Sequence, residues 1–470
     1  MPEGRRIVVL GGGPAGCGAA FRLRQTARAD VTLIERQSVV GGNAGSFDWG
    51  GQHLDFGSHR LHHACDPGVL SDIRALLGDD LLDRPRNGRI RLRNSFVRFP
   101  LKPADLLLRL DRAFAFGALR DMAAAPLRRR AAAGADSFAD VLLRSLGPTI
   151  CRDFYFPYAR KIWGREPSEL SGIQARRRVT ANSFAKLLRR VMKPVGAGRF
   201  YYPRRGFGQI SSALAATAES LGARFLMDTS VVGLQAPGGR GEPWRVETES
   251  PAGRHTTSAD DVWSTVPITL LARLIRPEPP PALIEAAGNI DFRAMILIYL
   301  QLDVDQFTPI DAHYFPEGNI AITRLSEPKN YAASSEPRGT TILCAELPCD
   351  PTDAVWSMSD AQLAERVSDD LRTASLPLQR SPIAVHVRRL RHAYPIYLRG
   401  YETPFGALDD WISRQPGLLT FGRQGLFAHD NTHHALFMAY CAVDCLADGE
   451  FDIERWARYR DLFASHVVED

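Results

Sequence analysis

The chain has 470 residues, of which 45% are apolar, 24% charged and 9% aromatic. This composition is typical of a globular protein with one extended core or two joined cores, and it excludes a disordered chain and a small disulfide-held scaffold. Lys and Arg number 58 against 53 Asp and Glu, a net charge of +5. Because this excess is too small for a dedicated binder of nucleic acid or of membrane surfaces, an anionic ligand would need a local cluster of arginines.

Seven cysteines form an odd set without a Cys-x-x-Cys pair. This favours buried free thiols over a disulfide framework or a zinc site, and it favours a reducing compartment. No apolar run approaches the roughly 20 residues that span a bilayer, and the first strand begins too early for a signal peptide. The sequence therefore predicts a cytoplasmic protein with no membrane span.

Apolar runs at 6–10 and 31–34 predict buried strands, and Ala and Leu at helical spacing predict a helix at 14–27 between them. Residues 68–150 are expected to be mostly helical. The later elements expected from periodicity are a helix at 209–221, strands at 224–227 and 230–234, a hairpin at 236–256, strands at 290–302, 320–325 and 340–347, and a helix at 431–447.

A glycine motif follows the first strand directly. Its first glycine, Gly11, permits a tight turn, Gly13 lets the backbone approach a pyrophosphate, and Gly16 allows close packing of helix and strand. Pro14 and Ala15 begin the helix, whose unpaired N-terminal amides and positive dipole end can hold phosphates. The strand, glycine motif and helix in this order predict dinucleotide binding.

Glu35 ends the second strand, where its carboxylate can accept hydrogen bonds from a ribose diol. A basic residue, Arg36, follows it, and then a glycine doublet, Gly41 and Gly42, precedes the polar Asn43. In this segment the chain resembles the superfamily of FAD-binding amine oxidases, protoporphyrinogen oxidases and phytoene desaturases. The resemblance implies FAD, rather than NAD, as the tightly held cofactor, with NAD(P)H as a candidate external reductant.

The resemblance continues near the other end of the chain. Gly422 and Arg423 stand before the helix expected at 431–447, where the superfamily has its last flavin-contacting segment. The N-terminus of that helix would then face the flavin pyrimidine ring, and its dipole would stabilise negative charge on the reduced flavin. The resemblance also implies that Val231 contacts the cofactor.

The implied fold is α/β. It combines a Rossmann-type, glutathione-reductase-like FAD-binding domain with an inserted helical region and a mixed-sheet substrate domain. The FAD-binding domain is expected to comprise 1–80, 203–265 and 411–470, the helical substrate or cap region 81–202, and the mixed-sheet domain 266–410.

Within the superfamily, several stretches look most like the UDP-galactopyranose mutase branch. Residues 55–62 resemble a flavin-side segment of these mutases that carries two histidines, here His59 and His62. Tyr158 and Trp163 stand in a stretch similar to their Tyr and Trp-Gly segment. The resemblance implies that His59 contacts the cofactor and that the two aromatic residues contact the substrate.

Two arginines, Arg177 and Arg324, fall where the mutases bind the substrate phosphates, although Arg176 and Arg178 compete for the first position. Forked guanidinium groups suit a diphosphate or carboxylate because they stay charged and can donate two hydrogen bonds at once. Tyr394 resembles a tyrosine that helps to bind the diphosphate. The expected substrate is therefore anionic or similar to a nucleotide sugar.

His429 is a departure from the mutases, which have a tyrosine at this distance from the late arginine. A neutral imidazole can bond to a flavin or act as a general base, so His62 and His429 join Arg324 as catalytic candidates. His433 and His434 lie close to His429 in the sequence, but no carboxylate or cysteine completes the usual spacing of ligands. No metal site is expected.

Four hypotheses for the function follow. The leading one is an FAD-dependent oxidoreductase that acts through flavin N5 on a small polar, sugar-derived anionic metabolite. The second is a redox-neutral nucleotide-sugar pyranose/furanose mutase that needs reduced FAD. An amine oxidase or desaturase is the third, disfavoured by the arginine-rich middle segment, and a non-enzymatic flavin scaffold is the fourth. The composition, rich in Ala and Arg, suggests a bacterial source, whereas the electron acceptor and the oligomeric state stay open.

Overall fold

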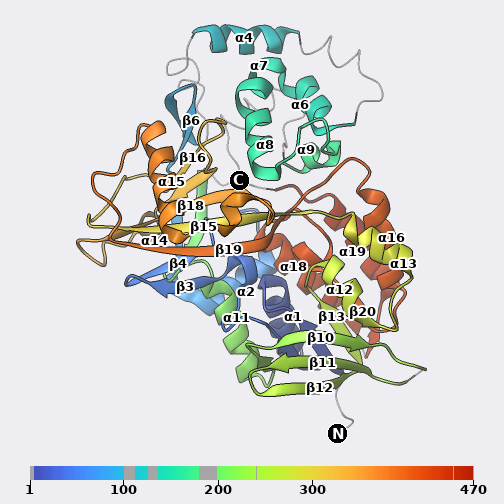
Figure 1. The fold of residues 1–470 in the computed structure, drawn as a ribbon. Coiled ribbons are helices and arrows are strands. Elements are labelled where there is room, and N and C mark those ends of the chain that lie inside the picture. The colour runs from blue at the N-terminus through green and yellow to red at the C-terminus, as the bar shows by residue number, and fades with distance from the viewer. Residues whose placement is uncertain are drawn as a thin grey trace.

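Five parallel strands from three separate stretches of the chain form one sheet in the computed structural model (Figure 1). The central strands are short apolar runs buried on both faces, which is typical of parallel sheets. The α/β class is thus confirmed. Across the sheet the order is β20 (Leu418–Thr420), β13 (Asp261–Ser264), β1 (Arg6–Leu10), β2 (Asp30–Ile34) and β9 (Arg224–Leu226). The structure describes residues 5–99, 112–124, 136–178, 198–239, 241–447 and 449–468.

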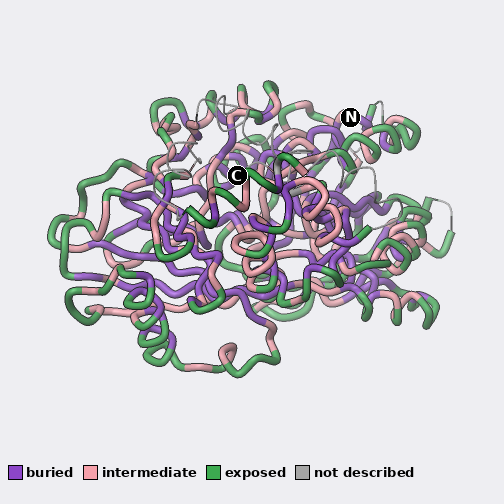
Figure 2. Tube along the Cα trace, turned by 90° about the horizontal axis from the view of Figure 1, so that it is seen from above, coloured by how far each residue is buried: buried purple, intermediate pink, exposed green. Residues whose placement is uncertain are grey.

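Helices cover one face of this sheet. Ile7 and Val9 of β1 pack with α1 (Pro14–Gln25), α11 (Gln209–Ser220) and α18 (Thr432–Asp444) in one buried cluster. The opposite face of β1 packs against a second sheet, because successive residues of a strand alternate between faces. Figure 2 shows buried residues in the interior of the molecule and exposed residues on its outer loops. The strands of the second sheet are β12 (Gly253–Ala259), β11 (Trp244–Ser250), β10 (Ser230–Gln235) and β14 (Ile275–Arg276).

A seven-stranded mixed sheet lies beside the parallel sheet (Figure 1). Its long strands pair antiparallel, and the one at Thr341–Cys349 is buried at every position. The strand expected at 320–325 begins only at Arg324. The order is β19 (Ala384–Pro395), β15 (Phe292–Leu302), β18 (Thr341–Cys349), β17 (Arg324–Ser326), β16 (Ala312–Tyr314), β6 (Gly88–Leu92) and β7 (Ser95–Phe99).

Residues 81–99 are strands, although the sequence predicted a mostly helical stretch. The hairpin of β6 and β7 turns at Arg93 and Asn94, whose φ angles of 51° and 63° match a tight two-residue turn. In β6, apolar residues alternate with arginines at the period of two that is typical of a strand. The prediction of a mostly helical stretch did not take this alternation into account. The preceding β5 (Leu81–Pro85) pairs with β8 (Arg199–Pro203).

A helical part stands on the mixed sheet, as Figure 1 shows at the top. Parts of the stretch expected to be helical, 100–111 and 125–135, lie outside the described residues, and the boundaries of the expected regions stay predictions. The helices of this part are α4 (Arg112–Ala123), α6 (Phe138–Leu146), α7 (Pro148–Ile150), α8 (Phe156–Trp163) and α9 (Gly172–Arg178).

The remaining elements complete the layers. One helix that the sequence analysis missed, α19 (Ile453–Ala464), follows α18 and begins at the N-cap Asp452. The other helices are α2 (Pro67–Leu77), α12 (Ile268–Leu274), α13 (Pro281–Gly288), α14 (Pro328–Ala332), α15 (Asp360–Thr373), α16 (Glu402–Ser413) and α17 (Gly422–Gly425). The short strands are β3 (Ser46–Trp49), β4 (Gln52–Asp55), β21 (Leu446–Ala447) and β22 (Glu450–Phe451).

All seven cysteines are buried and free, as the odd count predicted. Among the described residues, no helix combines the length and the apolar character needed to cross a bilayer.

Lys161 ties helix α8 to the mixed-sheet region. Its Nζ donates hydrogen bonds to the backbone carbonyls of Phe315, Glu317 and Ile322, which lie around the turn between β16 and β17. Burial lowers the pKa of Lys161 to about 7. The lysine therefore satisfies three carbonyls that no helix or strand ladder serves, and it fixes the position of α8.

We expect Lys161→Met to lower the free energy of unfolding by about 2 kcal/mol. The substitution removes the donor shared by the carbonyls of Phe315, Glu317 and Ile322, and a buried acceptor left without a partner costs about 1–3 kcal/mol. Urea denaturation measures this loss. Arg160→Gln, which removes only an exposed ion pair with Glu166, is the neighbouring control and should cost less than about 1 kcal/mol. Equal losses for the two variants would contradict the assigned role of Lys161.

Candidate functional site

The first glycine motif forms the turn between β1 and α1. Gly11 has a φ of 97°, and a Cβ on Gly16 would lie 1.9 Å from the carbonyl oxygen of Gly11. Only glycine fits both positions. Helix α1 then begins at Pro14 and Ala15 with no side-chain cap, so its first amides are available to an anion from outside the chain.

The second glycine segment lies directly against the first. Gly41 has a φ of 110° and its amide donates to the carbonyl of Gly12 at 2.7 Å. A Cβ on Gly42 would lie 3.1 Å from Cα of Gly13, whereas a Cβ on Gly13 would meet only Cα of Gly42, at 4.0 Å. The two segments thus build a cradle of bare backbone, which has the shape that a dinucleotide pyrophosphate requires.

Glu35 stands at the edge of this cradle. Its side chain is buried, and its carboxylate accepts from the amides of Gly12 at 2.7 Å and Gln37 at 2.8 Å. The neighbouring Arg36 is exposed, and Val231 lies half-buried on β10. The uncapped helix, the bare backbone and the carboxylate together fit the adenosine end of FAD, the cofactor that the resemblance implies.

The late segment closes the same region from the other side. Gly422 has a φ of 79°, and a Cβ there would lie 2.8 Å from Cβ of Ala15 at the start of α1. Arg423 donates to the carbonyls of Ala393 at 2.9 Å and Asp430 at 3.4 Å. Asn43 donates to the carbonyl of His392, the residue before Ala393, at 2.8 Å. The end of β19 is thereby held by both predicted flavin segments.

The segment with the two predicted histidines links the cradle to the mixed sheet. The amide of Phe56 donates to Gly45 of the second glycine segment at 3.0 Å, and the amide of Ser58 donates to Glu346 on β18 at 2.8 Å. The His59 ring bonds to the carbonyl of Phe56 at 3.0 Å. Burial lowers the pKa of His59, so its imidazole is the neutral form near neutral pH. His62 is also buried, and its Nδ1 accepts from the amide of Ala64 at 3.0 Å.

Four predicted residues from three parts of the chain meet near the end of β19. The ring of His429 lies 6.3 Å from Trp163 and 5.3 Å from Tyr394, measured between centroids. The guanidinium of Arg423 lies 5.2 Å from the Tyr394 ring. Tyr158, from the same helix as Trp163, stacks on Phe154 at 5.9 Å. The structure thus brings together the positions at which the resemblance implies substrate contacts.

Arg324 is engaged with a carboxylate of its own chain. Its Nε and Nη2 donate to the two oxygens of Glu346 at 2.9 and 2.7 Å, and both side chains are largely buried. The resemblance implied that Arg324 contacts a substrate phosphate. The structure shows that any substrate anion must share it with Glu346.

Arg60, which sequence reasoning missed, is a second buried cation in this region. It donates to the hydroxyls of Tyr314 and Tyr331, both at 2.8 Å. Burial alone would raise the pKa of Tyr314, but Arg60 and Arg324 hold it below its usual value. In the sequence Arg60 lies between the two predicted histidines, His59 and His62. This position could have identified it as a candidate site residue.

Arg177 has a different set of partners. It donates to the hydroxyl of Tyr397 at 3.0 Å and to the carbonyl of Ala464 at 3.4 Å. Arg176 is exposed and pairs with Asp136, and the side chain of Arg178 lies outside the described part. The two arginines that the resemblance implies as a phosphate clamp therefore contact separate groups.

The three late histidines that are neighbours in the sequence point to different partners. His429 faces Tyr394, His433 lies 6.3 Å from His62, and His434 stacks on His466 at 4.2 Å. Burial lowers the pKa of His433 to about 3 and that of His434 to about 2. Both rings are therefore neutral. His433 and His434 lie 4.1 Å apart between ring centroids, whereas His429 faces Tyr394 instead.

Arg324→Gln should lower the free energy of unfolding by about 3–5 kcal/mol, because it leaves the buried carboxylate of Glu346 without its cation. The double variant Arg324→Gln with Glu346→Gln removes both charges and should recover most of this loss. Urea denaturation of the two variants and the parent measures the difference. A double variant as unstable as the single one would show that the pair does not act as a unit.

Gly13→Val should give a folded chain that fails to retain FAD. The added side chain meets little protein but fills the face of the cradle that a pyrophosphate must approach. Flavin absorbance per purified chain and circular dichroism measure the two properties. Gly406→Ala is the control, since a Cβ there has nothing within 4 Å, and it should keep full FAD content. Normal flavin content in Gly13→Val would place the pyrophosphate elsewhere.

Comparison with solved structures confirms the fold. A reduced UDP-galactopyranose mutase superposes with a TM-score of 0.79 at 20% identity, over 99% of this chain and 100% of that one. A putrescine oxidase bound to putrescine superposes with a TM-score of 0.65 at 18% identity, over 93% and 97%. At such identities the likeness shows the fold alone.

Comparison of sequences gives the family. A phytoene dehydrogenase of Streptomyces griseus is 38% identical over 78 residues, which are 17% of this chain and only 15% of that protein's length. The profile of the family described as flavin containing amine oxidoreductase matches residues 14–438. This span contains Gly16 of the first glycine motif, the second glycine segment and Arg423, and it covers most of the chain. The chain therefore belongs to the flavin containing amine oxidoreductase family, and its cofactor is FAD.

Proposed function

We propose that this FAD-dependent oxidoreductase oxidises a small, polar, anionic metabolite of the sugar-acid or sugar-phosphate kind. The observation that carries the proposal is the pair of buried guanidinium groups, Arg60 and Arg324, on the mixed-sheet side of the His59 segment. Together they lower the pKa of the phenol between them, Tyr314. A group that depresses the pKa of a neighbouring acid also favours a bound anion.

The balance of charge in this region supports an anionic ligand. Glu346 compensates Arg324, but the two hydrogen-bond acceptors of Arg60 are neutral phenols. Asp311 also interacts with Arg60, and burial raises the pKa of that carboxyl. A carboxylate or phosphate would gain charge-assisted hydrogen bonds here, whereas a protonated amine would meet a cation.

The chain's own groups can perform the proton transfer of such an oxidation. FAD, when bound, accepts a hydride from a substrate carbon at N5. The proton of the adjacent hydroxyl must go to a base, and a neutral imidazole is suited to this near neutral pH. His429 is the first candidate because Trp163 and Tyr394 hold its ring among the expected substrate contacts. His62 is the second, since it lies on the predicted flavin-side segment.

A redox-neutral sugar mutase is the second candidate function. It is favoured by the meeting of Trp163, Tyr394 and Arg423, which occupy positions that the resemblance to the mutases implies. Two features count against it: Arg324 is shared with Glu346, and His429 replaces a tyrosine. An amine oxidase or desaturase has less support, because the two guanidinium groups of Arg60 and Arg324 on this side favour an anion over a protonated amine or an apolar chain. The cytoplasmic location stays a prediction.

The test is anaerobic addition of candidate substrates to the oxidised, FAD-loaded protein. We expect a sugar acid, a sugar phosphate or a nucleotide sugar to bleach the flavin, whereas putrescine should not. Arg60→Gln should weaken the apparent affinity at least about tenfold, because it removes hydrogen bonds from a charged donor. Arg380→Gln, an exposed arginine paired with Asp303, is the control and should match the parent.

Bleaching by amines alone would overturn the proposal, as would an unchanged affinity in Arg60→Gln. Conversion of a nucleotide sugar only by pre-reduced protein, without net bleaching, would select the mutase instead. Flavin content and the melting temperature of each variant show whether it is folded.

A further inference from the structure

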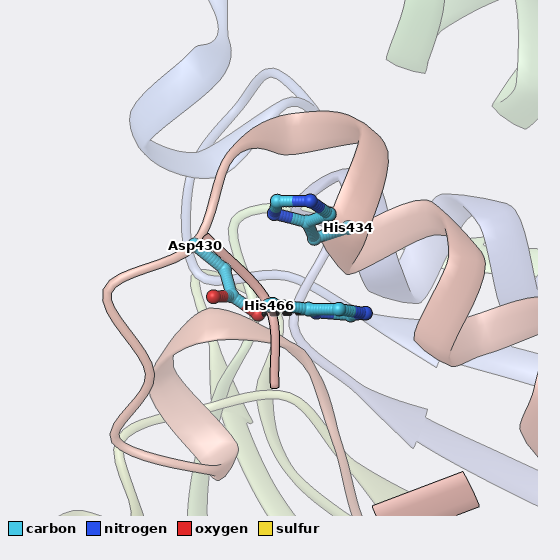
Figure 3. A group of neighbouring side chains, drawn as sticks. All are labelled: Asp430, His434 and His466. Carbon is cyan, nitrogen blue, oxygen red and sulfur yellow. Dashed lines mark hydrogen bonds and ion pairs between the residues drawn. The ribbon is translucent and has the colours of Figure 1, made fainter. Parts of the chain in front are cut away.

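Three possible metal ligands converge beside the last flavin segment. Asp430 precedes α18, His434 lies in its first turn, and His466 follows α19. Each offers one ligand atom, and these atoms lie within 4.8 Å of one another. Figure 3 shows the carboxylate of Asp430 beside the two imidazole rings, which are stacked with an angle of 17° between their planes. Because the lone pair of an imidazole lies in the plane of its ring, one ring must turn about its side-chain bonds for both to ligate one ion.

The carboxylate of Asp430 is only partly satisfied by the chain. Its side chain is 0% exposed, and Oδ2 accepts from Nδ1 of His466 at 3.0 Å. Its other oxygen, Oδ1, is buried and has no hydrogen-bond partner among the described residues. Because a buried, unpaired carboxylate oxygen is costly, such an atom usually has an ion or a water as its partner.

The two imidazoles can supply unprotonated nitrogens. The amide of Asn431 donates to Nδ1 of His434 over a long distance of 3.3 Å. That nitrogen therefore carries a lone pair, and replacing this weak hydrogen bond with a metal–nitrogen bond costs little free energy. In His466 the proton on Nδ1 must move to Nε2 or leave when the ring becomes a ligand, as imidazole ligation requires. The His466 side chain is 10% exposed, which gives an entry path from solvent.

We propose that Asp430, His434 and His466 bind one divalent transition-metal ion of the Zn²⁺ type. Two imidazole nitrogens and one carboxylate oxygen suit Zn²⁺, Co²⁺ or Ni²⁺, whereas Ca²⁺ and Mg²⁺ prefer sets of oxygen ligands. Three ligands from the protein leave a fourth position for water. Arg177 also interacts with Asp430, so the ion has to share the carboxylate with one cation.

The bound ion would join the C-terminal end of the chain to the segment that carries His429. His466 lies after the last helix, and Asp430 is the residue that follows His429 in the chain. The ion would thus hold the loop before α18 in place from the side of α19. This inference does not depend on which substrate the protein oxidises.

The experiment uses the full-length, FAD-loaded protein, first dialysed against a chelator and then equilibrated with Zn²⁺, Co²⁺ or Mg²⁺. Metal analysis should find one Zn²⁺ or Co²⁺ per chain, and the melting temperature should rise with these ions but not with Mg²⁺. Asp430→Asn and His466→Gln should each weaken Zn²⁺ binding about tenfold or more.

His53→Gln is the matched control, because His53 and Asp48 form a histidine–aspartate pair on the surface. It should bind Zn²⁺ as the parent does. Unchanged Zn²⁺ binding in His466→Gln, or an equal rise of the melting temperature with Mg²⁺, would overturn the proposal. Since His466 lies beyond the last helix, its replacement should leave the FAD content intact, which verifies that the variant is folded.

Discussion

The close approach of three backbone segments at the start of α1 is the constraint on which the rest of the structure depends. A Cβ on Gly16 would lie 1.9 Å from the Gly11 carbonyl oxygen, one on Gly422 would lie 2.8 Å from Ala15, and one on Gly42 would lie 3.1 Å from Gly13. The first two distances exclude a side chain, and the third leaves it little room. These contacts set the distance between β1 and α1 and hold the first and last parts of the chain together. They also leave bare amides at a helix N-terminus, which is what a pyrophosphate needs. The close packing of bare backbone at these glycines is therefore needed both for the fold and for binding of the cofactor.

In the other half of the site, around the His59 segment, side chains and not backbone atoms make the main contacts. Around the His59 segment the contacts are between charged and aromatic side chains, with Arg60 bound by phenols and Arg324 by Glu346. A buried guanidinium group costs free energy unless its donors find acceptors, and two donors of Arg60, Nη1 and Nη2, do so here. The phenols provide such partners without cancelling the charge, so the region stays electropositive while it is well ordered. The family supplies the flavin, and the proposed preference for an anionic substrate rests on these guanidinium groups.

Local sequence signals predicted the cofactor half well and the other half poorly. The glycine motif, the first two strands and the acidic residue at Glu35 are encoded within a few neighbouring residues. The partner of Arg324 is not, because Glu346 lies opposite it only when β17 and β18 pair in their observed register. The same holds for His466, which reaches His434 through the fold of α19 and not through any spacing along the chain. The strands at 81–99 were missed because the whole stretch 68–150 was predicted to be mostly helical.

The sheet order has a consequence for how the protein is made. The parallel sheet takes its first two strands from the N-terminus but its edge strand β20 from Leu418–Thr420, and α18 follows still later. A ribosome must therefore release nearly the whole polypeptide before the cradle can close around a nucleotide, and until then the nascent N-terminal half exposes an unfinished apolar face. Flavin capture should be one of the last events of biogenesis, and chaperones have a long interval in which to act.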